Sequence, residues 1–154
     1  MFTNTVLYQK LGKLIPFLEF QLFKIVFDVP NAKQMIIEMN TQEQLFQKGV
    51  DSKGVPLMDI GGDYAFITKD LKDRAGQPID RITLKDTGDF YRSWTVRILA
   101  DTIFIEADTI KDGGDLRSRW GNDILGLTEE SKQKLINYAV GKYRQHILNK
   151  WATS

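Results

Sequence analysis

The chain has 154 residues, of which 42% are hydrophobic and 27% are charged, an ordinary composition for a single globular domain. Its 21 basic and 20 acidic residues leave a formal charge of +1, so the net charge gives no support to a nucleic-acid partner. The absence of cysteine excludes a disulfide framework, a thiol nucleophile and cysteine metal ligands, and the single histidine, His146, excludes any site that needs two imidazoles.

The most apolar stretch is LIPFLEFQLFKIVFDV, residues 14–29, but it is too interrupted to span a membrane, which requires about 20 apolar residues. The interrupting residues are Pro16, Glu19, Gln21, Lys24 and Asp28. The start of the chain also lacks the basic leader and the small-residue cleavage site of a secretory signal. We therefore expect a protein of a reducing, cytoplasmic compartment without a membrane partner.

Residues 4–27 carry apolar side chains at spacings of three and four, which is the period of a helix. Pro16 either kinks this helix or starts a second one. Another side of the helix is also apolar, through Phe17, Phe20, Phe23 and Phe27. Because a helix that is apolar nearly all round must be covered, two interpretations stay open: these phenylalanines form an assembly interface with a neighbouring subunit, or the helix is the core of the domain.

Residues 30–49 predict a further helix, with Pro30 at its start, Gly49 at its end and a potential break at Asn40. Residues 1–48 would then form a helical N-terminal part.

Residues 50–80 contain the turn-forming clusters DSKGVPL and DIGGD. We expect a long irregular loop here, with room for one short helix through AFITKDLKDR. A loop of this length in a small domain is usually functional or mobile.

Residues 82–110 show the period of two that is typical of strands. In SWTVRI the apolar residues Trp94, Val96 and Ile98 alternate with polar ones, and TIFIEA continues the pattern. Only LAD separates the two runs, so this segment is predicted to form a turn followed by an antiparallel β-hairpin.

The turn-rich segment KDGGDLRSRWGND precedes an amphipathic C-terminal helix, predicted over residues 127–150. Thr128 is placed to cap this helix, and Glu129 and Glu130 fall in its first turn, where carboxylates favour the helix dipole. Its expected inner positions are Leu135, Tyr138, Ala139, Tyr143, Ile147 and Trp151. The predicted fold is one α+β domain over the whole chain, residues 1–154, with a small antiparallel sheet flanked by long N-terminal and C-terminal helices.

The acidic residues near the hairpin raise the hypothesis of a metal-dependent nuclease or hydrolase, since carboxylates hold hard cations. They are Asp86, Asp89, Asp101, Glu106 and Asp108. Glu106 and Asp108 share one face of a strand, but no lysine follows at the spacing of a nuclease strand, and Asp101 fits the hairpin turn. KDGGD at 111–115 lacks the ligands of a calcium loop and the ending of a phosphate loop. We expect no catalytic residue, no metal and no cofactor.

A locally basic stretch gives a second hypothesis, binding to a phosphate backbone. Its cations are Lys69, Lys72, Arg74, Arg81 and Lys85. Aspartates are interleaved with them, which favours a mixed solvated surface, and the nearby aromatic residues Tyr91 and Trp94 are the candidates for stacking on bases. His146 has no evident catalytic partner in the sequence.

The polar segment ITLKDTGDFYRSW, residues 82–94, is predicted to have a structural role, turning the backbone before the hairpin. Gly88 adopts a positive φ at no cost, and Asp86 or Thr87 can cap exposed amides. Phe90 and Trp94, four residues apart, share a face if one helical turn forms here.

Within this segment, LKDTGDFYRS resembles the central motif of the tail-completion and virion-morphogenesis proteins of tailed bacteriophages. The other motifs of that family find counterparts in the same order, in VDSKGVPL at 50–57, in the two predicted strands and in ILGLTEES at 124–131. The segment DLRSRWGND departs from the family pattern and keeps only Trp120 and Gly121 of an aromatic-glycine end. The positions of the motif and of the later turn are Leu84, Thr87, Gly88, Phe90, Ser93, Trp94, Leu125, Gly126 and Leu127.

The resemblance implies a small, non-enzymatic α+β subunit at the neck of a phage virion, a head-tail connector or tail-completion protein that assembles as a ring. It implies as partners other copies of the chain and the portal, adaptor or tail-tube proteins, with DNA only as passing cargo. The location would be the virion, and the host cytoplasm during assembly. The alternatives that stay open are a nucleic-acid-binding accessory protein and a metal-dependent hydrolase that uses Glu106 or Asp108.

Overall fold

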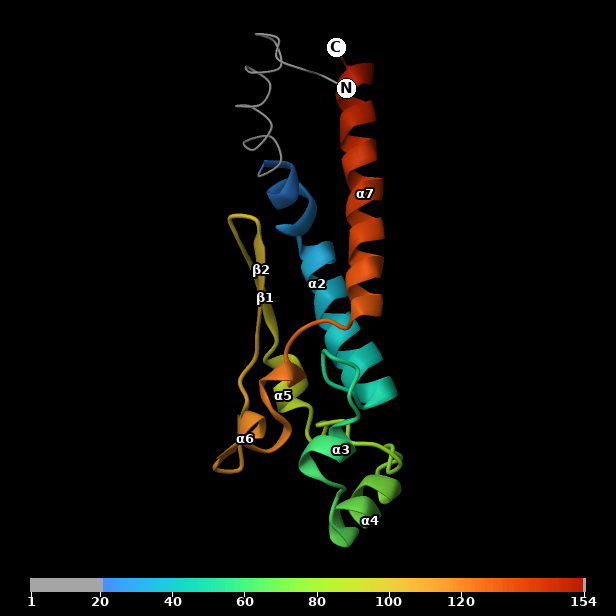
Figure 1. The fold of residues 1–154 in the computed structure, drawn as a ribbon, viewed down its shortest axis with the longest axis vertical. Coiled ribbons are helices and arrows are strands. Elements are labelled where there is room, and N and C mark those ends of the chain that lie inside the picture. The colour runs from blue at the N-terminus through green and yellow to red at the C-terminus, as the bar shows by residue number, and fades with distance from the viewer. Residues whose placement is uncertain (1–20, 154) are drawn as a thin grey trace.

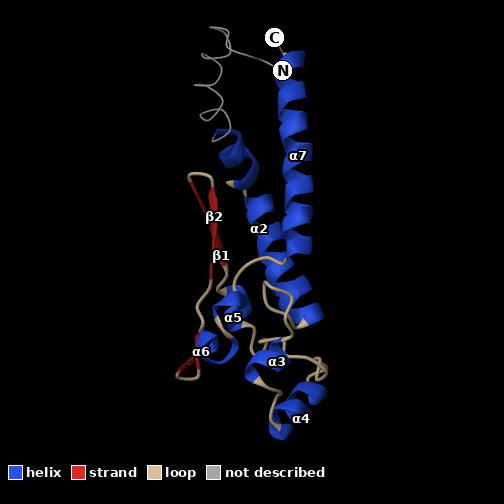
Figure 2. Cartoon of the chain, in the orientation of Figure 1, coloured by secondary structure: helices blue, strands red, loops and turns tan. Residues whose placement is uncertain are grey.

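The computed structural model describes residues 21–153 and has an α+β architecture dominated by helices (Figures 1 and 2). Residues 21–27 are helical. The elements that follow are α2 (Pro30–Glu38), the π-helical segment η1 (Met39–Lys48), α3 (Leu57–Gly61), α4 (Phe66–Arg74), α5 (Asp89–Arg92), β1 (Thr95–Leu99), β2 (Thr102–Glu106), β3 (Ile110–Lys111), β4 (Gly114–Asp115), α6 (Leu116–Trp120), the 3-10 turn η2 (Asn122–Ile124) and α7 (Glu129–Ala152). The predicted fold class is confirmed.

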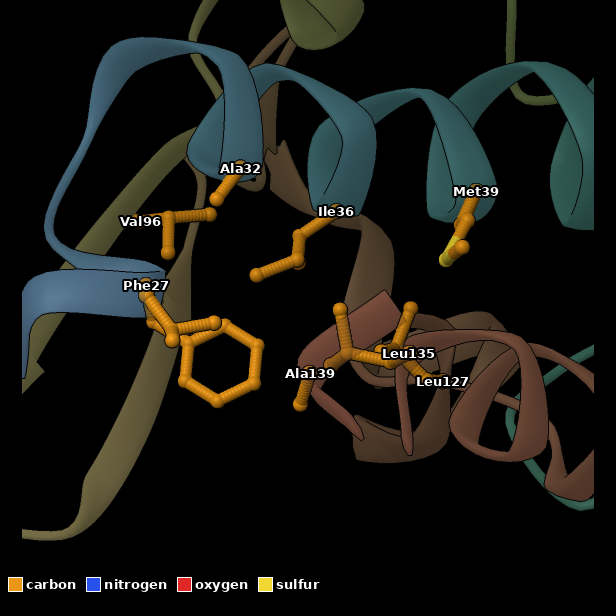
Figure 3. Packing of buried hydrophobic residues seen from close by; sticks show 9 residues of the cluster. Phe27, Ala32, Ile36, Met39, Val96, Leu127, Leu135 and Ala139 are labelled. Carbon is orange, nitrogen blue, oxygen red and sulfur yellow. The ribbon is translucent and has the colours of Figure 1, made fainter. Parts of the chain in front are cut away.

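Helix α2 lies between the β1–β2 hairpin on one side and α7 on the other (Figure 1). Its buried residues Ala32 and Ile36 meet Val96 of β1, and Leu135 and Ala139 of α7, in one hydrophobic cluster (Figure 3). A second cluster gathers around the end of η1, where α3, α5, α6 and η2 pack. Its buried members are Leu45, Leu57, Ile82, Leu84, Phe90, Trp94, Trp120 and Ile124.

The predicted helix boundaries follow from capping chemistry. Pro30 opens α2 after Val29 in an extended conformation, where its missing N–H costs nothing. Gly49 ends η1 at φ 64°, and a Cβ there would lie 2.9 Å from the Cβ of Arg81, so glycine is required on both grounds. Thr128 caps α7, because its hydroxyl accepts a hydrogen bond from the Ser131 amide at 3.3 Å. The predicted break at Asn40 corresponds to the change from α-helical to π-helical turns, which begins at Met39.

The described end of the N-terminal helix packs into the first cluster through Val26 and Phe27, while Ile25 is 48% exposed. A bend at residues 28–29 separates residues 21–27 from α2. Phe27 is only 4% exposed, with its ring 4.8 Å from that of Phe23 and 6.5 Å from that of Tyr138. Phe27 therefore contributes to the interior of this chain and is not available as an assembly interface. Phe17 and Phe20, the other two members of that predicted interface, lie outside the described residues.

Residues 50–80 are more regular than predicted. The expected short helix is present as α4, and a second helix, α3, begins directly after Pro56, in a segment for which turns were expected. Leu57 at the start of α3 is fully buried in the second cluster, and this burial stabilises a five-residue helix that propensity alone does not.

The predicted antiparallel β-hairpin is formed by β1 and β2. Val96 pairs with Ile105 and Ile98 with Ile103 on the face toward α2, while Arg97 and Phe104 pair on the outer face. Ala100, at φ 55°, makes the tight turn together with Asp101. The KDGGD segment is a second, very short hairpin formed by β3 and β4.

Helix α7 is longer than α2 and extends beyond the end of the β1–β2 hairpin, and this divides its predicted inner stripe (Figure 1). Leu135 and Ala139 are buried as predicted, whereas Ile147 is 48% and Trp151 is 80% exposed. Tyr138 and Tyr143 are half-buried against the first cluster, so the predicted inner stripe was wrong only for Ile147 and Trp151, in the last two turns. Within residues 21–153, no helix combines the length and the apolar character needed to cross a bilayer.

If the first cluster is the packed core, shortening one of its buried side chains should lower the free energy of unfolding. Replacing the fully buried Ile36 by alanine should lower the free energy of unfolding by roughly 2–5 kcal/mol, because it removes buried methyl groups and leaves a cavity. Urea denaturation followed by circular dichroism measures this change. The matched control is Ile110→Ala at a position that is 62% exposed, where a change within about 0.5 kcal/mol is expected. Equal losses for the two variants would contradict the assignment of the core.

Candidate functional site

The central motif starts with a backbone segment held by two tyrosine side chains. The Thr83 amide donates a hydrogen bond to the hydroxyl of Tyr64 at 3.0 Å, and the hydroxyl of Tyr91 donates one to the Thr83 carbonyl. Burial raises the pKa of Tyr91 well above its ordinary value, so its hydroxyl remains a protonated donor. Leu84 follows in a positive-φ conformation (54°) that places its side chain in the second cluster. Both tyrosine hydroxyls serve to position the motif.

Gly88 turns the chain into α5 at φ 89°, as predicted. The Thr87 hydroxyl donates to the carboxylate of Asp89, and Arg92 forms an ion pair with the same carboxylate. The Thr87 hydrogen bond and the Arg92 guanidinium lower the pKa of Asp89, so it is ionised at neutral pH. The polar side chains of the turn are thus bonded to one another on the surface.

The second half of the motif anchors the turn to the hairpin. The rings of Phe90 and Trp94 are 5.5 Å apart in an edge-on arrangement, and both side chains are 4% exposed. Ser93 donates its hydroxyl hydrogen to the Phe90 carbonyl at 2.7 Å and accepts a hydrogen bond from the Asp108 amide at 3.0 Å. The serine therefore connects α5 to the residues that follow β2.

The ILGL turn is held by a residue far away in sequence. The side-chain amide of Asn40, fully buried in η1, donates to the Ile124 carbonyl at 3.3 Å and accepts from the Gly126 amide at 2.8 Å. Gly126 has φ 125°, a conformation that side chains disfavour. From the sequence, Asn40 is predicted only as a potential break in the helix. A carboxamide among the apolar inner positions of a helix was the signal for such a role.

The VDSKGVPL loop packs against the same turn. Asp51, 3% exposed, accepts hydrogen bonds from the amides of Lys53 (2.9 Å) and Val55 (2.8 Å), which closes the loop on itself. The Ser52 amide donates to the Asp123 carbonyl at 2.8 Å, and Lys53 pairs with the Asp123 carboxylate at 2.6 Å. The structure therefore brings together the three motifs that sequence analysis grouped by resemblance, and all three act in packing.

The acidic residues of the hydrolase hypothesis are engaged separately. Glu106 accepts two hydrogen bonds from Arg97, at 2.6 and 2.7 Å, and this interaction lowers the pKa of its carboxyl group. Asp86 pairs with Lys111 at 2.8 Å, and Asp108 accepts from the Ile110 amide at 3.0 Å. Over residues 21–153, no three carboxylate or imidazole side chains come together as a metal site would require.

The basic stretch is largely neutralised by its own aspartates. Lys69 pairs with Asp63, Arg74 with Asp70 at 2.9 Å, and Arg81 with Asp80 at 2.6 Å. The candidate stacking residues are also engaged, since Trp94 is buried and the Tyr91 hydroxyl is bonded to the backbone.

Lys72 is the exception among the cations, because it lies inside the fold. It is 8% exposed and donates to the Gln77 side chain at 2.9 Å and to the Lys85 carbonyl, with its ammonium 4.8 Å from the centre of the Tyr64 ring. It borders a cleft of about 380 Å³ that Trp120 also lines. These contacts hold the start of the motif against α4 and do not present the lysine to a phosphate.

His146, the only imidazole of the chain, lines a groove of about 390 Å³ between α7 and the helical residues 21–27. Ile25, Tyr138 and Lys142 line it with His146, and among residues 21–153 no serine and no carboxylate takes part in the lining. The described part of the groove therefore offers no partner for an imidazole base.

Comparisons with protein-family models, with curated proteins and with solved structures found no match to this chain. The function must therefore be argued from its own residues and from the motif resemblance.

The turn at Gly88 should tolerate a change of charge and reject a β-branched residue. Gly88→Val should lower the free energy of unfolding by about 1–2 kcal/mol, because valine must adopt a positive φ. Asp89→Asn should leave the midpoint of denaturation nearly unchanged, because the Asp89 side chain is 73% exposed. Thermal denaturation of the two variants beside the unmodified chain measures both effects. A larger loss for Asp89→Asn would assign the stretch a role other than turning the backbone.

Removing the side-chain amide of Asn40 should destabilise the fold by roughly 1–3 kcal/mol, because the buried Gly126 amide and Ile124 carbonyl lose their partner. Asn40→Ala is compared by urea denaturation with Asn31→Ala, an exposed asparagine in the adjoining helix α2. Equal midpoints for the two variants would show that Asn40 does not hold the ILGL turn.

Proposed function

We propose that the chain is a non-enzymatic structural subunit of a phage virion, a head-tail connector or tail-completion protein that acts in a ring of identical copies. The observation that carries this proposal is the use of the motif residues. Thr87, Gly88 and Ser93, which chemistry at this site would require as reactive or ligand-binding groups, are committed to turning the backbone and joining the motif to the hairpin. A motif of this kind maintains a fold whose function lies on its surface.

The surface supports an assembly role. Three apolar side chains of α4 and several on the outer side of α7 are exposed, among them Phe66 at 86% and Trp151 at 80%. Contiguous exposed apolar area typically marks a site of protein association. The partners proposed are other copies of the chain and portal, adaptor or tail-tube proteins.

The nucleic-acid alternative has less support, because the ion pairs of the basic stretch leave few cations for phosphates. The hydrolase alternative requires Glu106 or Asp108 to hold a metal. Glu106 is bonded through both carboxylate oxygens to Arg97, and Asp108 accepts a hydrogen bond from the Ile110 amide.

The proposal is tested in a phage from which the coding sequence has been deleted. Negative-stain images of the lysate should show separate heads and tails, and a plasmid copy should restore joined virions. A copy with Asp89→Asn should restore them as well as the unmodified chain, whereas Gly88→Val should restore fewer. Joined, infectious particles in the deletion phage would overturn the proposal.

The same purified protein distinguishes the nucleic-acid alternative. Titration into labelled double-stranded DNA at low and high salt should show no binding that weakens with salt. Salt-sensitive binding would instead favour the accessory-protein hypothesis.

A further inference from the structure

The β1–β2 hairpin is a two-stranded sheet, so each of its strands has one edge without a neighbouring strand (Figure 2). Strand β1 packs along α2, and β2 is the outer strand. Over residues 21–153, no hydrogen bond from outside the hairpin reaches the backbone of β2. The outer edge of β2 therefore offers unpaired backbone groups to an additional strand.

The turn of the hairpin determines which backbone groups are open. It has two residues, so Leu99 and Thr102 on either side of it form the hydrogen-bonded closing pair. Hydrogen-bonded and non-hydrogen-bonded pairs alternate along an antiparallel hairpin. Ile103 and Ile105 therefore direct their N–H and C=O groups away from β1, toward the open edge.

Strand β2 lacks the features that protect an edge from association. Natural edge strands are protected by proline, by lysine or by a bulge. The sequence of β2, TIFIE, contains neither proline nor lysine, and its five residues pair with β1 without a bulge. Its central residue, Phe104, is 39% exposed on the outer face of the hairpin.

The sequence TIFIE is also complementary to itself when two copies run antiparallel. With a two-fold axis at Phe104, Ile103 of one copy lies opposite Ile105 of the other, and Thr102 lies opposite Glu106. Phe104 lies opposite the same residue of the second copy. The two isoleucine pairs fall on the face toward α2 and the phenylalanine pair falls on the outer face, so apolar side chains meet on both faces.

No like charges lie directly opposite each other in this register. Glu106 is the only charged side chain of β2, and both of its carboxylate oxygens are bonded to Arg97 of the same hairpin. The carboxylates nearest to the strand, Asp101 and Asp108, would each lie opposite an alanine.

We infer that β2 of one copy pairs with β2 of a second copy, which gives a four-stranded antiparallel sheet with α2 of both copies on the same face. The open groups of Ile103 bond to those of Ile105 across the axis. Phe104 forms the non-hydrogen-bonded pair between them, where opposite side chains approach most closely. The contact is isologous and pairs two copies. The inference goes beyond the proposed head-tail function and does not depend on it, because it concerns association of the free chain.

Pairing of β2 with β1 of a second copy is the alternative. It requires the edge of β1, the strand that packs along α2. In the register of the hairpin itself it would place Phe104 opposite Arg97. The two arrangements therefore differ in what faces Phe104, which is another phenylalanine in the first and an arginine in the second.

The test places charges on the two-fold axis of the full-length chain. By size-exclusion chromatography with light scattering, the unmodified chain at about 1 mM should be a dimer of its 17.7 kDa subunit. Phe104→Lys and Phe104→Glu should each weaken self-association by about tenfold or more, because each variant brings two like charges opposite each other. An equimolar mixture of the two variants should recover the dimer, since lysine then faces glutamate.

Two controls accompany these variants. Circular dichroism of each Phe104 variant should match that of the unmodified chain, because the side chain lies on the outer face of the hairpin. Ile110→Lys and Ile110→Glu introduce the same charges at a position that is 62% exposed and outside β2, and they should leave the dimer unchanged.

Amide hydrogen exchange measured by NMR examines the backbone directly. Exchange of the Ile103 and Ile105 amides should slow as the protein concentration rises through the range in which the dimer forms. The Phe104 amide, which is bonded inside the hairpin, should be protected at every concentration.

Four results would overturn the inference. The first is an unmodified chain that stays monomeric at about 1 mM, where a dissociation constant below millimolar is detected. The second is a dimer that Phe104→Glu does not weaken, which would indicate the edge of β1. The third is a mixture of the two variants that stays monomeric. The fourth is protection of the Ile103 and Ile105 amides in a monomer, which would indicate that a segment of the same chain covers the edge. None of these results depends on the deletion phage, so failure of the pairing and failure of the head-tail function can be told apart.

Discussion

The fold depends on the two hydrogen bonds that the buried side-chain amide of Asn40 makes to the turn at residues 124–126. The turn is the point where the chain leaves one hydrophobic cluster, at Ile124, and enters the other, at Leu127. Asn40 occupies the corresponding point of the central helix, between Met39 in one cluster and Leu45 in the other. A pair of hydrogen bonds in this buried position has exact geometric requirements, and it fixes where α7 starts relative to α2.

The contact between Asn40 and this turn lies at the place where the short motifs, which are far apart in the sequence, come together in the fold. The VDSKGVPL loop is bonded to Asp123 at the start of the turn, and the central motif fills the second cluster through Leu84, Phe90 and Trp94. Each motif contains a local backbone turn, at Asp51, Gly88 or Gly126, and the apolar side chains Leu57, Phe90 and Ile124 of the three motifs meet in the second cluster. The polar residues of the motifs therefore have structural roles. The exposed helices α4 and α7 are left as surfaces to which a partner can bind.

Those two surfaces are at opposite ends because the clusters stack along one axis (Figure 1). The fully buried side chains of α7 come from its first turns, Tyr143 is half-buried against the first cluster, and Ile147 and Trp151 beyond it are 48% and 80% exposed. Helix α4 closes the other end and is held through Lys72. A molecule with two different apolar ends has a direction, and directional subunits are suited to rings or to stacked layers in a larger particle.

The sequence by itself determined the local elements: the hairpin from alternation, the end of η1 from Gly49, the cap of α7 from Thr128 and the turn at Gly88, because each depends on the chemistry of neighbouring residues. It also determined the fold class, whereas the proposed head-tail function remains a prediction from motif resemblance. Only the tertiary structure decided that residues 50–80 contain α3, that Phe27 is core and that the end of α7 is exposed, since these depend on which elements lie alongside and how far each extends. The role of Asn40 belongs to the same group, because its partners lie 84 and 86 residues away and no local pattern encodes a contact over that separation.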